Sequence, residues 1–128
     1  MAANDTRPVN LDLTKFSFPI TAIASILHRV AGGVIWVGLG IALYVLCAAT
    51  ESAEGFANIA LALEQNFLAQ FIAWGLLSSF GYYCAATLKH IIQELGFFED
   101  LAGGRAISWA VIIIGIVVTI AAGVYVWA

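Results

Sequence analysis

Charged side chains are scarce in this sequence. Among 128 residues there are five Lys and Arg and eight Asp and Glu, while 62% of the chain is hydrophobic. A soluble globule would need more polar surface than this to cover its exterior. The basic residues are also too few to form the positive patch that nucleic-acid binding requires. The composition therefore indicates a membrane protein and argues against a nucleic-acid partner.

Cysteine and histidine are nearly absent as well. The chain has Cys47 and Cys84 in separate apolar segments and His28 and His90 as its two histidines, with no C-x-x-C pair. This pattern lacks the spacing of a metal site, so no metal ligand is predicted in the chain. Each cysteine is expected to be a small apolar residue within its helix. No internal repeat or long linker divides the sequence, which favours a single domain over residues 1–128.

Long apolar runs are what the sequence has in quantity. They cover about residues 20–49, 67–94 and 106–127. A helix needs about 20 mostly apolar residues to cross roughly 30 Å of hydrocarbon, so each run is long enough for one span. The sequence thus predicts an all-α membrane protein with three transmembrane helices. The segments 51–65 and 95–105 are expected to be loops, and neither is long enough to fold a catalytic domain.

The positions of the few basic residues predict how the chain is oriented in the membrane. Three of them precede or open the first span, and two flank the connection between the second and third spans. By the positive-inside rule, the leader 1–19 and this connection are predicted on the cytoplasmic side, with the C-terminus on the opposite side. The basic residues are Arg7, Lys15, Arg29, Lys89 and Arg105.

Polar residues gather at the start of the first span, in the stretch ASILHRVAGGVIW. Ser25, His28, Arg29 and Gly32 follow one another at steps that place them on one helix face. An Arg at this depth can simply extend toward lipid head groups. The neighbouring hydroxyl and imidazole, with a glycine that leaves room beside them, favour a second interpretation. In that interpretation a flat molecule with a polar head docks on this face.

A second polar stripe lies on the second span and runs toward the same cytoplasmic end. Its members are Ser79, Tyr83, Thr87, His90 and Glu94. Polar side chains inside a membrane usually face the bundle interior or a partner chain. Hydrogen bonding between helices, without any ligand, is enough to account for Ser79 and Thr87. His90 and Glu94, at the end of the stripe, fit that interpretation less well.

Three segments of the sequence resemble a known family, and the resemblance covers essentially the whole chain. They are RPVNLDL at Arg7–Leu13, FPITAIASILHRVAG at Phe18–Gly32 and KHIIQELGFFED at Lys89–Asp100. With these segments the chain closely resembles the b-type cytochrome membrane-anchor subunit of bacterial succinate dehydrogenase. The S-x-x-H-R-x-x-G pattern after the short leader makes the resemblance more specific than a three-helix hydropathy profile.

The resemblance implies a place in a larger assembly. Members of the family pair with a second three-helix anchor subunit, and together the two chains hold a flavoprotein subunit and an iron–sulfur subunit on the cytoplasmic face of the bacterial inner membrane. Electrons from succinate pass through those subunits to ubiquinone, which links succinate oxidation to the respiratory chain. The C-terminus is then expected on the periplasmic side.

The resemblance also implies roles for individual residues. The family's quinone-binding Ser and Arg fall on Ser25 and Arg29, and its histidines near the haem propionates fall on His28 and His90. A hydroxyl donor and a fixed cation suit a quinone because its oxygens gain electron density on reduction. Arg suits the second role because it stays charged when partly desolvated.

One position departs from the family pattern. The resemblance implies a haem b shared with the second anchor subunit and held by a His seven residues before His90, where this chain has Tyr83. Three outcomes stay open: a partner His holds the iron alone or with a substitute ligand, Tyr83 ligates as a phenolate, or the site is empty.

Other functions remain compatible with a small helical bundle. A related anchor could serve a fumarate reductase, and a passive scaffold could hold a soluble enzyme without forming a site. A transporter or ion-pathway subunit would be expected to carry an ionisable residue near the middle of a span, and this sequence has none there.

Overall fold

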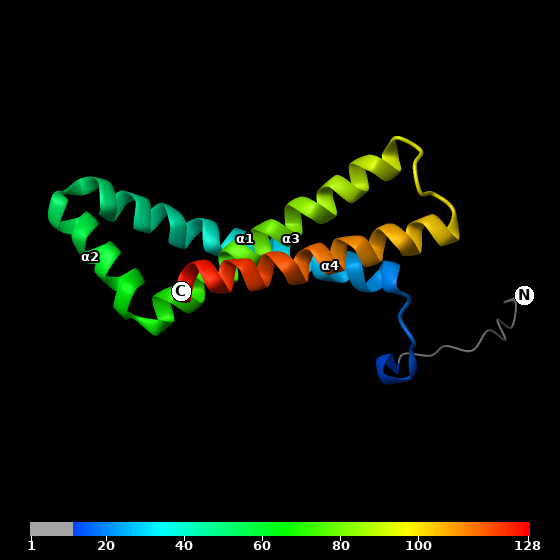
Figure 1. Ribbon diagram of the computed structural model, residues 1–128, viewed down its shortest axis with the longest axis horizontal. Helices are drawn as coiled ribbons and strands as arrows, with labels where there is room; N and C mark the ends of the chain where they lie inside the picture. The colour runs from blue at the N-terminus through cyan, green and yellow to red at the C-terminus, as the bar shows by residue number, and fades with distance from the viewer. Residues whose placement is uncertain (1–11) are drawn as a thin grey trace, which may run out of the picture.

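Helices make up nearly all of the structure. The computed structural model describes residues 12–128, and within them there is no strand. Three long helices lie side by side and a shorter one packs at one end (Figure 1). In chain order the elements are the 3₁₀ turn η1 (Leu13–Lys15), α1 (Ile20–Glu51), α2 (Ala53–Gln65), α3 (Phe67–Glu94) and α4 (Leu101–Trp127). Because α1, α3 and α4 are each long and apolar enough to cross a membrane, the prediction of an all-α membrane protein is confirmed.

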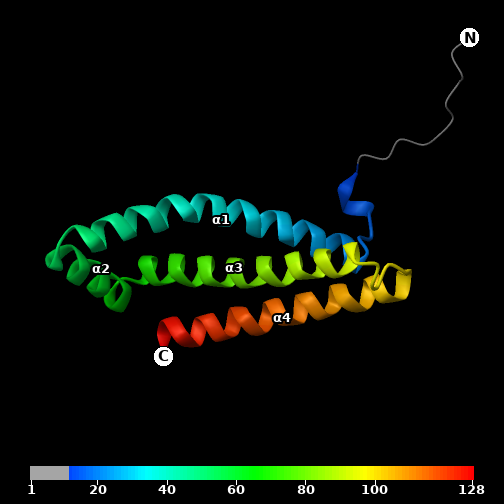
Figure 2. The same cartoon turned by 90° about the horizontal axis from the view of Figure 1, so that it is seen from above.

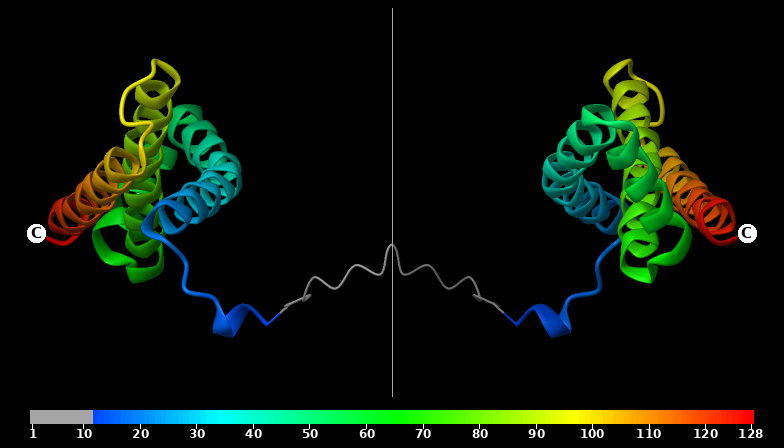
Figure 3. Two further views of the ribbon diagram at one scale, coloured as in Figure 1. Left: turned by 90° about the vertical axis from the view of Figure 1, so that its right-hand side faces the viewer. Right: turned by 90° about the vertical axis from the view of Figure 1, so that its left-hand side faces the viewer.

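The helix α3 lies between α1 and α4 and packs against both, as the views in Figures 2 and 3 show. The start of α1 and the connection between α3 and α4 lie at one end of the bundle, and α2 and the C-terminus lie at the other. We call the end that carries residues 12–23 and 95–105 the basic end, because Lys15, Lys89 and Arg105 lie in or next to it. Residues 1–11, which hold Arg7 and most of the predicted leader, lie outside the described residues.

Side-chain caps and a glycine set the helix boundaries. Asn66 Oδ1 accepts hydrogen bonds from the amides of Leu68 and Ala69 at the start of α3, at 2.9 and 3.2 Å. At the other end of α3, Gly96 has φ +85°, a left-handed conformation that costs glycine little. Its amide donates to the carbonyl of Gln93 at 2.9 Å, which satisfies one of the helix's last carbonyls.

The segment 51–65, expected as a loop, is almost entirely the helix α2. Ser52 separates it from α1 with an extended backbone, and the Ser52 hydroxyl accepts from the amide of Gly55 at 2.9 Å. The helix packs against α1 and α3. A helix of 13 residues is shorter than a membrane span, so the length of its apolar run does not distinguish it from a loop in the sequence.

The segment 95–105 is also shorter as a loop than expected, because α4 begins at Leu101. Its first five residues include Gly103, Gly104 and Arg105, whose low hydropathy hid the helix start. Asp100 caps the first turn by accepting from the amide of Gly103 at 3.1 Å.

Small side chains fill the contacts between the long helices. Ala24 and Ala31 on α1, Ala86 on α3 and Ser108 on α4 are buried. Small residues let the helix backbones approach closely, which is the usual basis of packing within membranes. Lys89 is buried too, as long basic side chains often are along their methylene stems near helix ends. The large apolar side chains mostly point outward, so the outer surface suits lipid or a partner helix.

Candidate functional site

The two predicted polar stripes meet near the basic end of the bundle. His28 lies on α1, and Tyr83, Thr87 and His90 lie on the facing side of α3. We call these four residues the His28 cluster. The helical spacing of each stripe brings its members to one face, and the packing of α1 against α3 brings the two faces together.

His28 is the centre of the cluster. Its Nε2 lies 3.2 Å from the Thr87 hydroxyl, within hydrogen-bond distance. The imidazole stacks on the Tyr83 ring with centroids 4.4 Å apart and planes at 25°. The His90 ring lies on a further side, with its centroid 5.2 Å from that of His28 and a tilt of 47°. His28 is half-buried, whereas Tyr83 and His90 are exposed.

Ser25 and Arg29 lie beside the His28 cluster and have an open side. Arg29 is exposed and Ser25 is half-buried. Within residues 12–128 neither side chain makes a hydrogen bond or an ion pair. A helix places residues four apart on the same face, so the hydroxyl and the guanidinium form one polar wall. Such a wall can bind a ligand oxygen that approaches from outside this chain.

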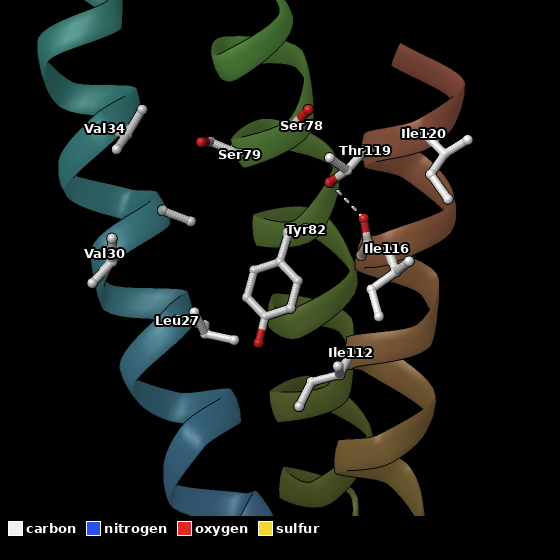
Figure 4. Close-up of a pocket in the computed structure, with 12 residues that line it drawn as sticks. Leu27, Val30, Val34, Ser78, Ser79, Tyr82, Ile112, Ile116, Thr119 and Ile120 are labelled. Carbon is white, nitrogen blue, oxygen red and sulfur yellow. Dashed lines mark hydrogen bonds between the residues drawn. The ribbon is translucent and has the colours of Figure 1, made fainter. Parts of the chain in front are cut away.

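The remaining members of the second stripe lie elsewhere. Ser79 points toward α1 and lines a cavity of about 380 Å³ between α1, α3 and α4 (Figure 4). The cavity is mostly apolar, with Leu27 and Val30 on its α1 side, and the buried hydroxyl of Ser78 has no hydrogen-bond partner. Glu94, the last residue of α3, is exposed.

The space beside Gly32 is occupied by a ring of this same chain. A Cβ atom at Gly32 would lie 3.2 Å from Tyr83 Cε2, so the Tyr83 ring packs against the glycine as well as on His28. The glycine had been expected to leave room for a flat molecule. The structure fills that room, at least in part, with the phenol ring of Tyr83.

Tyr82 is a site residue that the sequence reasoning missed. Its hydroxyl donates to the carbonyl oxygen of Ala24 at 2.9 Å, in a buried hydrogen bond between α3 and α1. The chemistry of the side chain could have suggested this bond, since a buried tyrosine usually finds a hydrogen-bond partner for its hydroxyl. With two adjacent tyrosines, however, the sequence pattern favoured Tyr83 and left its neighbour unassigned.

Comparisons with known proteins cover nearly all of this chain. Residues 3–122 match the family model described as the succinate dehydrogenase/fumarate reductase transmembrane subunit. The succinate dehydrogenase cytochrome b556 subunit of Coxiella burnetii is 38% identical over 97% of this chain and 99% of its own length. The succinate dehydrogenase cytochrome b560 subunit of Reclinomonas americana is 31% identical, over 77% of this chain and 71% of the relative. The succinate dehydrogenase cytochrome b556 subunit of Paracoccus denitrificans is 27% identical, over 83% of this chain and 81% of the relative. The family match includes every residue of the His28 cluster.

Proposed function

Because the chain belongs to the succinate dehydrogenase/fumarate reductase transmembrane subunit family, we propose that it is the membrane anchor of a succinate:ubiquinone oxidoreductase and forms part of the ubiquinone site. The observation that carries the quinone role is the open polar wall of Ser25 and Arg29 beside the His28 cluster. The relatives described above bear the names of succinate dehydrogenase subunits, which favours succinate oxidation over fumarate reduction.

Each residue of the wall has a definite task in this proposal. The Ser25 hydroxyl donates a hydrogen bond to a quinone carbonyl oxygen, and the Arg29 guanidinium stabilises the negative charge that develops there on reduction. The wall lies near the basic end, so protons have a short path from water to the quinone oxygens. The open side of the wall is completed by other chains of the complex.

The partners in this proposal are a second anchor subunit, an iron–sulfur subunit and a flavoprotein subunit. The two soluble subunits dock at the basic end, which faces the cytoplasm, and the C-terminus faces the periplasm of a bacterial inner membrane. The grouping of Lys15, Lys89 and Arg105 at that end supports this orientation by the positive-inside rule. The chain itself carries no succinate chemistry and contributes the anchor and the quinone wall.

Haem b is the cofactor that the relatives' cytochrome names imply for them. The residues present here do not fit a histidine ligand from this chain, because Tyr83 stands at the expected position with its ring stacked on His28. We propose that any haem shared with the second anchor subunit would take its iron ligands from outside this chain. His28 and His90 then lie on the propionate side.

Purification of the tagged chain from its native membrane tests the function. The expected result is a complex that contains a flavoprotein and an iron–sulfur protein and reduces ubiquinone with succinate. A faster reduction of fumarate by a low-potential quinol would favour the fumarate reductase alternative. Recovery of the chain without either soluble subunit, and without succinate-dependent quinone reduction, would contradict the proposal.

A further inference from the structure

The helices α1 and α3 are joined by two hydrogen bonds in the described residues, and both lie close to Ser25. In one, the Tyr82 hydroxyl donates to the Ala24 carbonyl at 2.9 Å. In the other, His28 Nε2 and the Thr87 hydroxyl are 3.2 Å apart. Ala24 and His28 are one helical turn apart on α1, and Ser25 lies between them. The polar attachment of α1 to α3 is therefore concentrated at the quinone wall.

The Tyr82 bond acts on the backbone of Ser25 itself. The Ala24 carbonyl and the Ser25 amide belong to one planar peptide group, so a force on the oxygen orients the whole plane. That plane sets the direction in which the Ser25 side chain leaves the helix. Within α1 the Ala24 carbonyl also accepts the helical bond from the His28 amide. Loss of the Tyr82 hydroxyl thus leaves no unpaired carbonyl and leaves α1 helical.

Tyr82 can transmit position because its ring is in close contact with α4 on one side, while another side of the ring borders the cavity of about 380 Å³. The side chain is 9% exposed and lies between α1 and α4, as Figure 4 shows. On the α4 side it packs on Gly115, where even a Cβ atom would approach Tyr82 Cδ2 to 2.5 Å. The ring is therefore held by α3 and α4 while its hydroxyl holds α1.

We propose that Tyr82 and Thr87 are positioning residues that fix the height and rotation of α1 at which Ser25 and Arg29 bind quinone. The inference rests on the proposed quinone site and adds two residues of α3 that do not touch the substrate. It assigns to the adjacent tyrosines separate tasks, since Tyr82 orients the wall and Tyr83 packs on His28.

Tyr82→Phe and Thr87→Val test this in the whole complex. Each removes one hydroxyl, and each is expected to raise the KM for a short-chain ubiquinone about three-fold, the effect expected for one interhelical hydrogen bond in a membrane. Succinate oxidation with a soluble dye should not change. Thr87→Ser keeps the hydroxyl and should restore the original KM. Unchanged quinone kinetics in both Tyr82→Phe and Thr87→Val would overturn the proposal.

A matched control separates positioning from general packing. Trp74 Nε1 donates to the carbonyl of Thr119 at 3.0 Å, a bond between α3 and α4 that lies away from the wall. Trp74→Phe removes a bond of the same kind and should leave the quinone KM unchanged. An equal rise in KM for Trp74→Phe would show that any loss of bundle rigidity has this effect and would overturn the positioning role.

A double-mutant cycle with Ser25→Ala decides whether Tyr82 acts through Ser25. In the Ser25→Ala background, Tyr82→Phe should raise KM clearly less than three-fold, because the hydroxyl that its bond orients is gone and only Arg29 is left to be positioned. A full three-fold effect in that background would overturn the proposal while leaving the quinone site intact. If Ser25→Ala alone leaves quinone kinetics unchanged, the proposed role of Ser25 fails first, and the positioning role fails with it.

Discussion

His28 and Tyr83 form a stacked pair across the interface of α1 and α3, with ring centroids 4.4 Å apart. The pair joins the two polar stripes through their ring faces, and Thr87 and His90 border it. The same phenol ring packs against Gly32. The position at which the family resemblance implies an iron ligand is therefore part of a packed interface within this chain. Ser25 and Arg29, in contrast, make no side-chain hydrogen bond or ion pair within residues 12–128.

Arg29→Leu should lower succinate:ubiquinone turnover by about 10- to 100-fold, the range expected for loss of a hydrogen bond from a charged donor. Succinate oxidation with a soluble acceptor at the flavoprotein should stay nearly unchanged, because electrons leave before the quinone. Steady-state assays of the purified complex with each acceptor measure the ratio of quinone turnover to succinate oxidation with the soluble acceptor.

Arg105→Leu provides the control for Arg29, since it removes the same charge from an exposed site at the basic end. Because the soluble subunits are proposed to dock at that end, any loss in Arg105→Leu should lower quinone turnover and succinate oxidation with the soluble acceptor equally, so the ratio of the two activities should match the original complex. Equal loss of both activities in Arg29→Leu would indicate failed assembly, which flavin content and subunit ratio would reveal. Full quinone activity in an assembled Arg29→Leu complex would contradict the proposed role.

The main helices could be predicted from the sequence because membrane spans have a simple physical signature. Each long helix contains an apolar run that exceeds the length needed to cross the bilayer. Helix α2 was missed because 13 residues fall below that length. The start of α4 was missed because Gly103 and Gly104 are poor helix formers and the Asp100 cap is a local hydrogen bond.

The candidate site could be predicted in part. Periodicity placed His28 on one face of α1 and Thr87 with His90 on one face of α3, and the structure brings these residues together. Periodicity placed Tyr83 on the polar stripe but gave no role to Tyr82, because the contacts of Tyr82 depend on the space beside Gly115. That space depends on a glycine of α4, so the sequence of α3 alone does not predict it.

The connection between α3 and α4 should be protected when the soluble subunits are bound. Phe97 and Phe98 are 61% and 49% exposed at the basic end, an unusual position for large apolar side chains next to water. Chymotrypsin, which cuts after aromatic residues, should cleave there in membranes stripped of the soluble subunits and leave the intact complex uncut. Mass spectrometry of the fragments locates the cuts.

Phe56 of α2 serves as the internal control for this experiment. It is 64% exposed at the opposite end of the bundle, so its cleavage should be the same in both preparations. Equal cleavage at Phe97 and Phe98 with and without the soluble subunits would argue against docking at the basic end.

Gly115→Ala should destabilise the bundle by about 1–3 kcal/mol, the usual cost of inserting a methyl group at a close contact between buried groups. The new Cβ would lie 2.5 Å from Tyr82 Cδ2, so the ring must move and its bond to Ala24 must weaken. Thermal denaturation of the detergent-solubilised complex should show a lower Tm. Gly123→Ala, also on α4, meets its nearest atom at 3.5 Å and should have a much smaller effect. Equal Tm values for the two variants would mean that Tyr82 is not confined by Gly115.

Substitution of Tyr83 tests where the haem iron obtains its ligands. If the axial ligation comes from outside this chain, Tyr83→Phe should leave the absorption and EPR spectra of the complex unchanged, because it removes the phenol oxygen and keeps the ring on His28. Tyr83→His places an imidazole at the position of the expected family ligand. Two imidazoles give a strong axial field, so where the original complex is high-spin or free of haem, this variant should shift the spectrum toward a low-spin form.

The two Tyr83 variants together distinguish the open possibilities. A changed spectrum in Tyr83→Phe would show that the phenol oxygen binds iron and would contradict ligation from outside the chain. An unchanged spectrum in Tyr83→His would mean that position 83 does not face the iron. Complexes without haem in the original protein would contradict haem retention, and haem uptake by Tyr83→His would then show that this tyrosine alone excludes it. The absorption spectrum of the unsubstituted complex is therefore the first measurement, because it decides which of these comparisons applies.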